Sequence, residues 1–318
     1  MTTKKLGSSD VCVSSIVLGT WAMGGDYFGA IEDKDSIRCI QTNIENGVTT
    51  IDSAEIYGNG RAELVVGRAL QGVSRDKYVM LSKAWTSHFG KDSIREAAEG
   101  SIKRLGCEYL DVYFLHYPPV EQSIAEAMES IARLKSEGII RAIGVSNFSL
   151  DQLKEARKYG QVDVIQPCYN LLWRYIDRDI LPYCIENNIG IITYSSIAQG
   201  LLTGKMTKDT VIEDGRKKAA LFQPGVYERC LEVTDFVKKV AQKYKKTPTQ
   251  VCINWLFNTT GITASIVGCK NEAQALENID SLDFTLSKED YDAINQASRD
   301  FTDKMPEYEL FFRTDVKK

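Results

Sequence analysis

Short apolar segments of the chain recur at an almost constant interval, and this recurrence constrains the fold more than any other feature. Marker residues at the ends of the first five segments are Gly19, Asp52, Lys83, His116 and Ser146, which are 33, 31, 33 and 30 residues apart. Such an interval holds one β-strand and one α-helix. The segments are nearly continuous in hydrophobicity, which is typical of buried parallel strands. The candidate strands are Ile16–Gly19, Thr49–Ser53, Tyr78–Ala84, Leu110–His116, Arg141–Ser146, Val164–Pro167, Ile189–Tyr194 and Ala264–Gly268.

Eight strand–helix units predict an α/β fold, the (β/α)8 or TIM barrel. We expect one domain, residues 1–318, because no long linker separates the units. Residues 4–15 predict an N-terminal β-hairpin around a Gly-Ser-Ser-Asp turn. The interval after the seventh strand is much longer, which predicts an inserted loop at about 201–225 and two helices split at 247–249. Residues 300–318 are expected to form a polar and aromatic tail over the barrel mouth.

Serine residues mark the expected starts of three of the intervening helices. The first two have a glutamate three residues after the serine, which is a capping-box pattern, and a glycine after the last apolar residue is a common stop. The expected starts are Ser93, Ser123 and Ser149, and the corresponding stops are Gly106, Gly138 and Gly160.

Composition argues against several classes of function. The formal net charge is −4 and there are no basic runs, so nucleic-acid binding is not expected. No apolar segment approaches the roughly 20 residues of a membrane span, and the N-terminus is not that of a signal peptide, so we expect a cytoplasmic protein. The eight cysteines lack C-x-x-C spacing and are expected to be reduced core thiols. With two histidines and no zinc-like spacing, no metal site is expected.

Polar side chains end three neighbouring strands, and the active site of such a barrel lies at the carboxyl ends of its strands. Asp52 ends the second candidate strand and Tyr57 follows in the loop, while Lys83 and His116 end the next two strands. Each has an ordinary explanation when taken alone: a turn cap, a packing aromatic, a solvated lysine or a structural histidine. Their occurrence together on one sector of the rim indicates a catalytic site.

These four side chains could deliver a proton to a carbonyl oxygen. A lysine ammonium beside the Tyr57 phenol is expected to lower the pKa of that phenol. Asp52 would hold Lys83 charged and in place, and His116 would orient the carbonyl. A lyase that uses Lys83 as a Schiff base is an alternative, which the neighbouring Asp52 disfavours because it favours the charged amine.

Four segments resemble signature segments of the aldo-keto reductases, in the order in which that family carries them. The resemblance covers the chain from Lys5 to about Asn278. It implies an enzyme that reduces aldehyde or ketone carbonyls, including sugar- and polyol-derived ones, to alcohols with hydride from NAD(P)H. It also implies a catalytic tetrad made of the four strand-end residues. The segments are Ile-Asp52-Ser-Ala-Glu-Ile-Tyr57-Gly, Ser-Lys83-Ala-Trp85, Leu-Asp-Val-Tyr-Phe-Leu-His116 and Ile-Gly-Val-Ser146-Asn147-Phe.

A cofactor-binding regulatory subunit, like the reductase-fold β subunits of potassium channels, is the alternative that the same resemblance allows. In either case the expected partner is a small molecule, with NADP(H) preferred as cofactor and NAD(H) as the second choice. Lys270, near the start of a helix, would meet the 2′-phosphate of NADP(H). Ser146, Asn147 and Gln166 would hold the nicotinamide carboxamide, and Tyr194 would stack on its ring.

The implied cofactor contacts are spread over six strand ends and the loops that follow them. Four positions depart from frequent family residues: Gly268-Cys269 replaces a Lys-Ser pair, Gln274 replaces a basic residue, and Ser196 replaces a proline. The full set is Gly19, Thr20, Trp21, Asp52, Ser146, Asn147, Gln166, Tyr194, Ser195, Ser196, Ile197, Ala198, Gly200, Lys205, Gly268, Lys270, Gln274, Glu277 and Asn278.

Aromatic residues follow several of the strands, as expected for the wall of a small-molecule pocket. Trp21 and Trp85 are predicted to contact the substrate together with Tyr57 and His116. Four further aromatics are expected in other rim loops, and these are Tyr27, Phe28, Trp173 and Tyr175.

Overall fold

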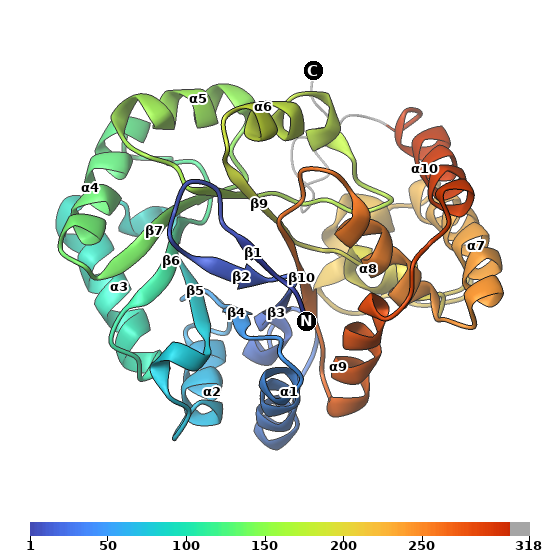
Figure 1. The fold of residues 1–318 in the computed structure, drawn as a ribbon, viewed down its shortest axis with the longest axis horizontal. Helices are drawn as coiled ribbons and strands as arrows, with labels where there is room; N and C mark the ends of the chain where they lie inside the picture. Colours follow the sequence, from blue (N-terminus) through green and yellow to red (C-terminus); the bar gives the residue numbers. More distant parts are fainter. Residues whose placement is uncertain (306–318) are drawn as a thin grey trace.

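Eight parallel strands close into a barrel in the computed structural model, which describes residues 1–305 (Figure 1). The order around the barrel is β10-β3-β4-β5-β6-β7-β8-β9, so the first and last barrel strands pair to close it. The predicted (β/α)8 fold is confirmed, and each strand lies within one residue of its predicted bounds at either end. The strands are β3 (Ile16–Gly19), β4 (Thr50–Asp52), β5 (Val79–Ala84), β6 (Leu110–Leu115), β7 (Ile140–Ser146), β8 (Val164–Gln166), β9 (Gly190–Thr193) and β10 (Ala264–Gly268).

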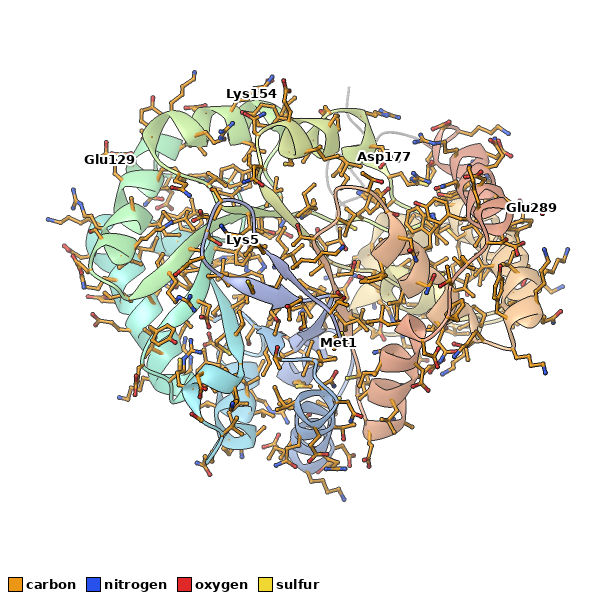
Figure 2. The ribbon with its side chains drawn as sticks, in the orientation of Figure 1. Met1, Lys5, Glu129, Lys154, Asp177 and Glu289 are labelled. Atoms are coloured by element: carbon orange, nitrogen blue, oxygen red, sulfur yellow. The ribbon has the colours of Figure 1, made fainter. Side chains whose placement is uncertain are left out.

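Helices surround the barrel and leave their charged faces to solvent. Figure 2 shows this for Glu129 and Lys154, which point outward from α4 and α5. The α-helices are α1 (Asp33–Glu45), α2 (Arg61–Ala69), α3 (Lys91–Leu105), α4 (Ile124–Ser136), α5 (Leu150–Tyr159), α6 (Ile180–Glu186), α7 (Val226–Tyr244), α8 (Pro248–Asn258), α9 (Glu272–Ile279) and α10 (Lys288–Thr302).

Short 3₁₀ helices lie in the loops between these elements. They are η1 (Trp21–Gly24), η2 (Arg75–Lys77), η3 (Thr86–His88), η4 (Tyr175–Arg178), η5 (Ala198–Thr203), η6 (Gly215–Lys218), η7 (Ala220–Phe222) and η8 (Asp280–Leu282).

Two of the three predicted helix starts are confirmed, and one is wrong. Ser123 and Ser149 each form a complete capping box at the starts of α4 and α5. Helix α3 instead begins at Lys91, two residues before the predicted start, with Gly90 as its N-cap. Ser93 therefore lies inside the first turn, where its hydroxyl donates to the Gly90 carbonyl at 3.2 Å. An extended glycine before the helix allows the chain to enter it without a serine cap.

An N-terminal hairpin closes the end of the barrel opposite the site. Strands β1 (Thr3–Lys5) and β2 (Cys12–Ser14) pair antiparallel, as predicted. Leu6, Val11 and Val13 pack in one buried cluster with apolar side chains of the barrel strands, such as Val17 and Phe114. The carboxyl ends of the strands are thereby left as the open end.

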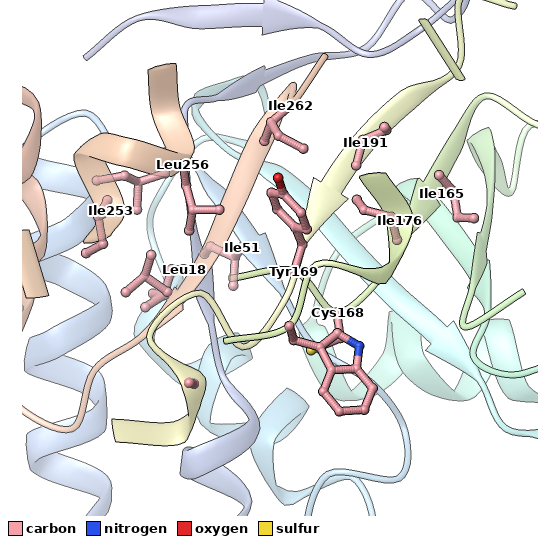
Figure 3. Close-up of a cluster of buried hydrophobic side chains, with 14 of the residues drawn as sticks. Leu18, Ile51, Ile165, Cys168, Tyr169, Ile176, Ile191, Ile253, Leu256 and Ile262 are labelled. Atoms are coloured by element: carbon pink, nitrogen blue, oxygen red, sulfur yellow. The ribbon is translucent and has the colours of Figure 1, made fainter. Parts of the chain in front are cut away.

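The larger hydrophobic core lies between the strands and the helices. Figure 3 shows a part of it, where Leu18 and Ile51 of the strands and Ile253 and Leu256 of α8 are all buried. All eight cysteines are free thiols, and six of them are buried. Within residues 1–305, no helix combines the length and the apolar character that a membrane crossing requires.

The segment after β9 has the predicted long insertion. Residues 198–222 form η5, η6 and η7, and α7 and α8 follow, separated at residues 245–247. The predicted tail begins later than expected, because α10 continues through Thr302. The rest of its predicted path over the barrel mouth, from residue 306, lies outside the described residues.

Candidate active site

A cavity of about 780 Å³ opens at the carboxyl ends of the strands. Most of the predicted site residues line it. Thr20, Lys83 and Ala198 do not, because each is fully buried behind the cavity wall. The predicted residues that line the cavity are Gly19, Trp21, Asp52, Tyr57, Trp85, His116, Ser146, Asn147, Gln166, Tyr194, Ser195, Ser196, Ile197, Gly200, Lys205, Gly268, Lys270, Gln274, Glu277 and Asn278.

Lys83 lies at the centre of a compact hydrogen-bonded cluster at the floor of this cavity. Its Nζ donates to Asp52 Oδ1 at 2.7 Å and to the Ser53 carbonyl at 2.8 Å. The same Nζ donates to the Tyr57 hydroxyl oxygen at 3.0 Å. All three hydrogens of the ammonium are thereby used. Because the phenol oxygen accepts this bond, the proton of Tyr57 remains available to another acceptor.

Burial and charge act in opposite directions on this cluster. Burial lowers the pKa of Lys83 and raises the pKa of Asp52, while the charge of each partner opposes the shift in the other. Burial also raises the pKa of Tyr57 well above its usual value, and the charges of Asp52 and Asp26 raise it further. The expectation that Lys83 lowers this pKa is wrong, because desolvation dominates and Asp52 offsets the ammonium charge. The phenol therefore stays protonated.

His116 packs among aromatic rings next to Tyr57. Its ring stacks on Tyr117 with 5.5 Å between centroids and meets Trp85 edge-on at 5.3 Å. Burial and the charge of Lys83 lower the pKa of His116 well below its usual value, so the imidazole is neutral. Its Nδ1 has no hydrogen-bond partner among residues 1–305. A neutral ring carries one N–H donor, as the orientation of a carbonyl requires.

The residues expected to hold the nicotinamide carboxamide are hydrogen-bonded to one another and to Asp52. Gln166 Nε2 donates to Asp52 Oδ2 at 2.8 Å, and Ser146 Oγ donates to the main-chain oxygen of Gln166 at 2.7 Å. The Tyr194 hydroxyl donates to Asn147 Oδ1 at 2.7 Å. The predicted carboxamide site is therefore continuous with the four strand-end residues.

The other end of the cavity is cationic. Lys270 precedes α9 as predicted, and its Nζ donates to the Phe28 carbonyl at 2.7 Å. Arg216, in the insertion after β9, binds Asp214 at 2.7 Å and donates to the Gln199 carbonyl at 3.1 Å. Burial and the charge of Arg216 lower the pKa of Lys270. A bound anion would relieve this repulsion. The basic side chains that line this end are Lys205, Arg216, Lys218 and Lys270.

Sequence reasoning missed Arg216 because it follows no strand. The signal that could have found it is the basic triplet at residues 216–218 within the long insertion, which is an exception to the expected absence of basic runs. The same wall has a glycine, Gly200, whose φ of +100° suits only a residue without Cβ. Three features of the cavity fit a phosphorylated dinucleotide. They are the clustered basic side chains, the backbone at Gly200 that a ligand can approach closely, and the hydrogen-bonded side chains of Ser146, Asn147 and Gln166.

Aromatic rings form the mouth, with two differences from the prediction. Trp21 stacks on Tyr27 with 4.4 Å between centroids and meets Phe28 edge-on at 5.0 Å. Trp173 and Tyr175 do not line the cavity. The loop after β8 turns inward, with paired backbone hydrogen bonds between Asn170 and Trp173, and this buries the indole in the core. Tyr117 lines the mouth and was missed, although it directly follows His116.

Metal binding has no candidate site in the described part of the chain. Within residues 1–305, no group of three or more His, Cys, Asp or Glu side chains is arranged to hold an ion.

The model of the "Aldo/keto reductase family" matches residues 15–299. The NADH-specific methylglyoxal reductase of Escherichia coli is 34% identical over 314 residues, which cover 90% of this chain and 94% of that protein. The glycerol dehydrogenase of Gluconobacter oxydans superimposes with a TM-score of 0.85 at 29% identity, over 95% of this chain and 97% of that one. An aldo/keto reductase from Klebsiella pneumoniae, solved with NADP and acetate, gives a TM-score of 0.77 at 29% identity, over 97% and 98%. With this coverage by the family model, the chain belongs to the aldo/keto reductase family.

Proposed function

We propose that this protein reduces the carbonyl group of small aldehydes or ketones to an alcohol, with Tyr57 as the proton donor. The observation that carries the proposal is the contact of 3.0 Å between Lys83 Nζ and the Tyr57 hydroxyl at the floor of an aromatic cavity. Candidate substrates are methylglyoxal, glyceraldehyde and dihydroxyacetone, in view of the names that the Escherichia coli and Gluconobacter relatives carry.

The four side chains divide the work of proton delivery. When bound, the reduced nicotinamide supplies a hydride to the carbonyl carbon. Tyr57 gives its phenol proton to the carbonyl oxygen, so one O–H bond breaks as the alcohol O–H bond forms. Lys83 stabilises the resulting phenolate, and Asp52 keeps Lys83 charged. His116 donates its N–H to the carbonyl oxygen and orients it. Water later returns a proton to the phenolate.

NADP(H) is the proposed preferred cofactor, supported by the cations at one end of the cavity. Lys270 and Arg216 would hold the 2′-phosphate, and Lys205 would meet the pyrophosphate. Ser146, Asn147 and Gln166 would hold the carboxamide. The Klebsiella relative was solved with NADP, whereas the Escherichia coli relative is named NADH-specific. Because these relatives differ in cofactor, membership of the family does not fix the cofactor preference, which depends on the residues around the proposed phosphate site.

The proton-donor role is tested by Tyr57→Phe. We expect kcat for carbonyl reduction to fall by roughly 10²- to 10⁴-fold, the contribution of a general acid, while NADPH binding is retained. The matched control is Tyr113→Phe, because the Tyr113 hydroxyl is buried away from the cavity and has no hydrogen-bond partner among residues 1–305. Near-normal turnover by Tyr57→Phe would exclude tyrosine as the acid. Tight NADPH binding by the unchanged protein, without oxidation by any carbonyl, would favour a regulatory subunit.

The phosphate assignment is tested by Lys270→Ala. A charge-assisted hydrogen bond contributes about 1.5–3 kcal/mol, so the Kd for NADPH should rise about tenfold or more, while the Kd for NADH changes little. Fluorescence titration with both cofactors measures this difference. Lys246→Ala is the matched control, since Lys246 pairs with Asp283 at 2.5 Å and does not line the cavity. Equal losses for the two cofactors would remove Lys270 from the phosphate site.

A further inference from the structure

Asp26 introduces an acidic side chain into the aromatic mouth of the cavity. It lies in the loop after η1, is exposed to solvent, and lines the cavity. Its Oδ2 accepts from the main-chain N of Gly58 at 3.2 Å, directly after Tyr57. Its Oδ1 accepts from the main-chain N of Tyr27 at 2.7 Å. The carboxylate is thus held in a defined place beside the proposed proton donor.

The other charges near the reacting groups cancel. Lys83 and Asp52 form a buried ion pair at 2.7 Å, which has no net charge. Tyr57 is protonated and His116 is neutral. Glu55, a second carboxylate near the rim, accepts from His88 Nδ1 and from the main-chain N of Trp85, and it does not line the cavity.

The cations of the cavity come from two loops. Lys205, Arg216 and Lys218 come from the insertion after β9, and Lys270 follows β10. In the barrel order these loops lie across the mouth from those that follow β5 and β6, whereas the Asp26 loop follows β3, the neighbour of β10. Lys270 Nζ donates to the Phe28 carbonyl and Gly215 N to the Tyr27 carbonyl, so these basic segments touch the Asp26 loop through its main chain. Among residues 1–305, Asp26 is held by main-chain N–H groups and forms no ion pair, so it is the unpaired carboxylate that lines the cavity beside Tyr57.

We propose that Asp26 is a specificity-determining residue, which makes the enzyme favour neutral or cationic carbonyl compounds over carboxylate-bearing ones. The inference depends on the proposed carbonyl reduction, and it narrows the substrate class of the same site. A fixed charge at the mouth of a low-dielectric cavity changes the local concentration and the binding of charged ligands. Anionic carbonyl compounds such as 2-oxo acids and dicarboxylic semialdehydes should therefore be poor substrates.

The test uses three aldehydes of similar shape and different charge: 4-carboxybenzaldehyde, methyl 4-formylbenzoate and 4-(trimethylammonio)benzaldehyde. With saturating NADPH, Asp26→Asn should raise kcat/KM for the anion about three- to tenfold, mainly through KM. It should lower kcat/KM for the cation and leave that of the neutral ester within about twofold. Added salt should reduce the differences in kcat/KM among the three substrates for the unchanged enzyme, but not for Asp26→Asn.

Two further variants separate charge from loop support. Asp26→Glu keeps the charge and should keep the order of the three substrates. Asp10→Asn removes an equal charge from the turn of the hairpin at the opposite end of the barrel, and it should change nothing. If Asp26→Asn instead alters all three substrates by one factor, Asp26 merely supports the Tyr57 loop and the proposal fails.

Failure of the inference can be distinguished from failure of the proposed function. Should Tyr57→Phe remain active while Asp26 still sets the charge order, the proton-donor scheme alone fails. Binding of the three corresponding benzyl alcohols to the NADP-loaded protein, measured by calorimetry, needs no turnover. If Kd depends on the charge of the alcohol and Asp26→Asn abolishes this dependence, the inference is supported. If Asp26→Asn leaves the ranking of the three Kd values unchanged, the inference is overturned.

Discussion

The phenol of Tyr57 combines an adjacent cation with a raised pKa. Lys83 donates to its oxygen at 3.0 Å, yet burial and the charges of Asp52 and Asp26 raise the pKa above the usual value. A proton donor with a high pKa is a weaker acid, but it is fully protonated at neutral pH. The Lys83 contact then serves to stabilise the phenolate after transfer, when the negative charge has formed.

This arrangement predicts a broad pH plateau for carbonyl reduction. The acid form of Tyr57 is needed, and its pKa is raised, so kcat should be constant at neutral pH and fall only when the pH exceeds that raised pKa. Protonation of His116 would limit the rate at low pH, and its lowered pKa moves that limit well below 6.5. Alcohol oxidation needs the phenolate, so its rate should rise with pH over the same range.

Steady-state rates in a constant-ionic-strength buffer from about pH 5 to 11 measure both directions and span the usual titration ranges of His and Tyr. Reduction that declines between pH 7 and 9 would contradict the raised pKa of Tyr57. Comparison with Asp26→Asn at each pH adds an internal check. Removing one of the negative charges that raise this pKa should move the alkaline limit of reduction to lower pH.

At the scale of single elements, two serines in similar sequence contexts occupy different places. Ser123 is the N-cap of α4, where its hydroxyl accepts from the main-chain N of Glu126 at 3.2 Å. Ser93, with a glutamate at the same spacing, lies within the first turn of α3. The pattern alone does not identify the cap, because the backbone of the preceding residue decides where the helix begins.

Replacement of each serine by alanine should separate the two roles. Ser123→Ala removes a capping bond and should lower the free energy of unfolding by about 1 kcal/mol. Ser93→Ala removes one bond to the Gly90 carbonyl but introduces the best helix former, so its effect should stay within about 0.5 kcal/mol. Urea unfolding of both variants measures the difference. Equal losses would mean that Ser93 caps the helix in solution.

At the scale of the whole molecule, the barrel was predictable from sequence because its strands are buried and regularly spaced. The positions of Asp52, Lys83 and His116 followed from that spacing, since strand ends meet at one rim. The loops carry no such period. Arg216 and Asp26 enter the cavity through loop conformations that depend on distant contacts, and Trp173 turns into the core for the same reason.

Closure of the barrel has a consequence for biosynthesis. Strand β3 pairs with β10, and Leu18 lies opposite Val267, roughly 250 residues later in the chain. At roughly 5–20 residues per second, synthesis takes roughly 12–50 s to deliver that partner. During this time one edge of β3 has unpaired backbone groups, which neighbouring nascent chains can contact. The finished barrel has no free edge, whereas the growing chain carries one for most of its synthesis.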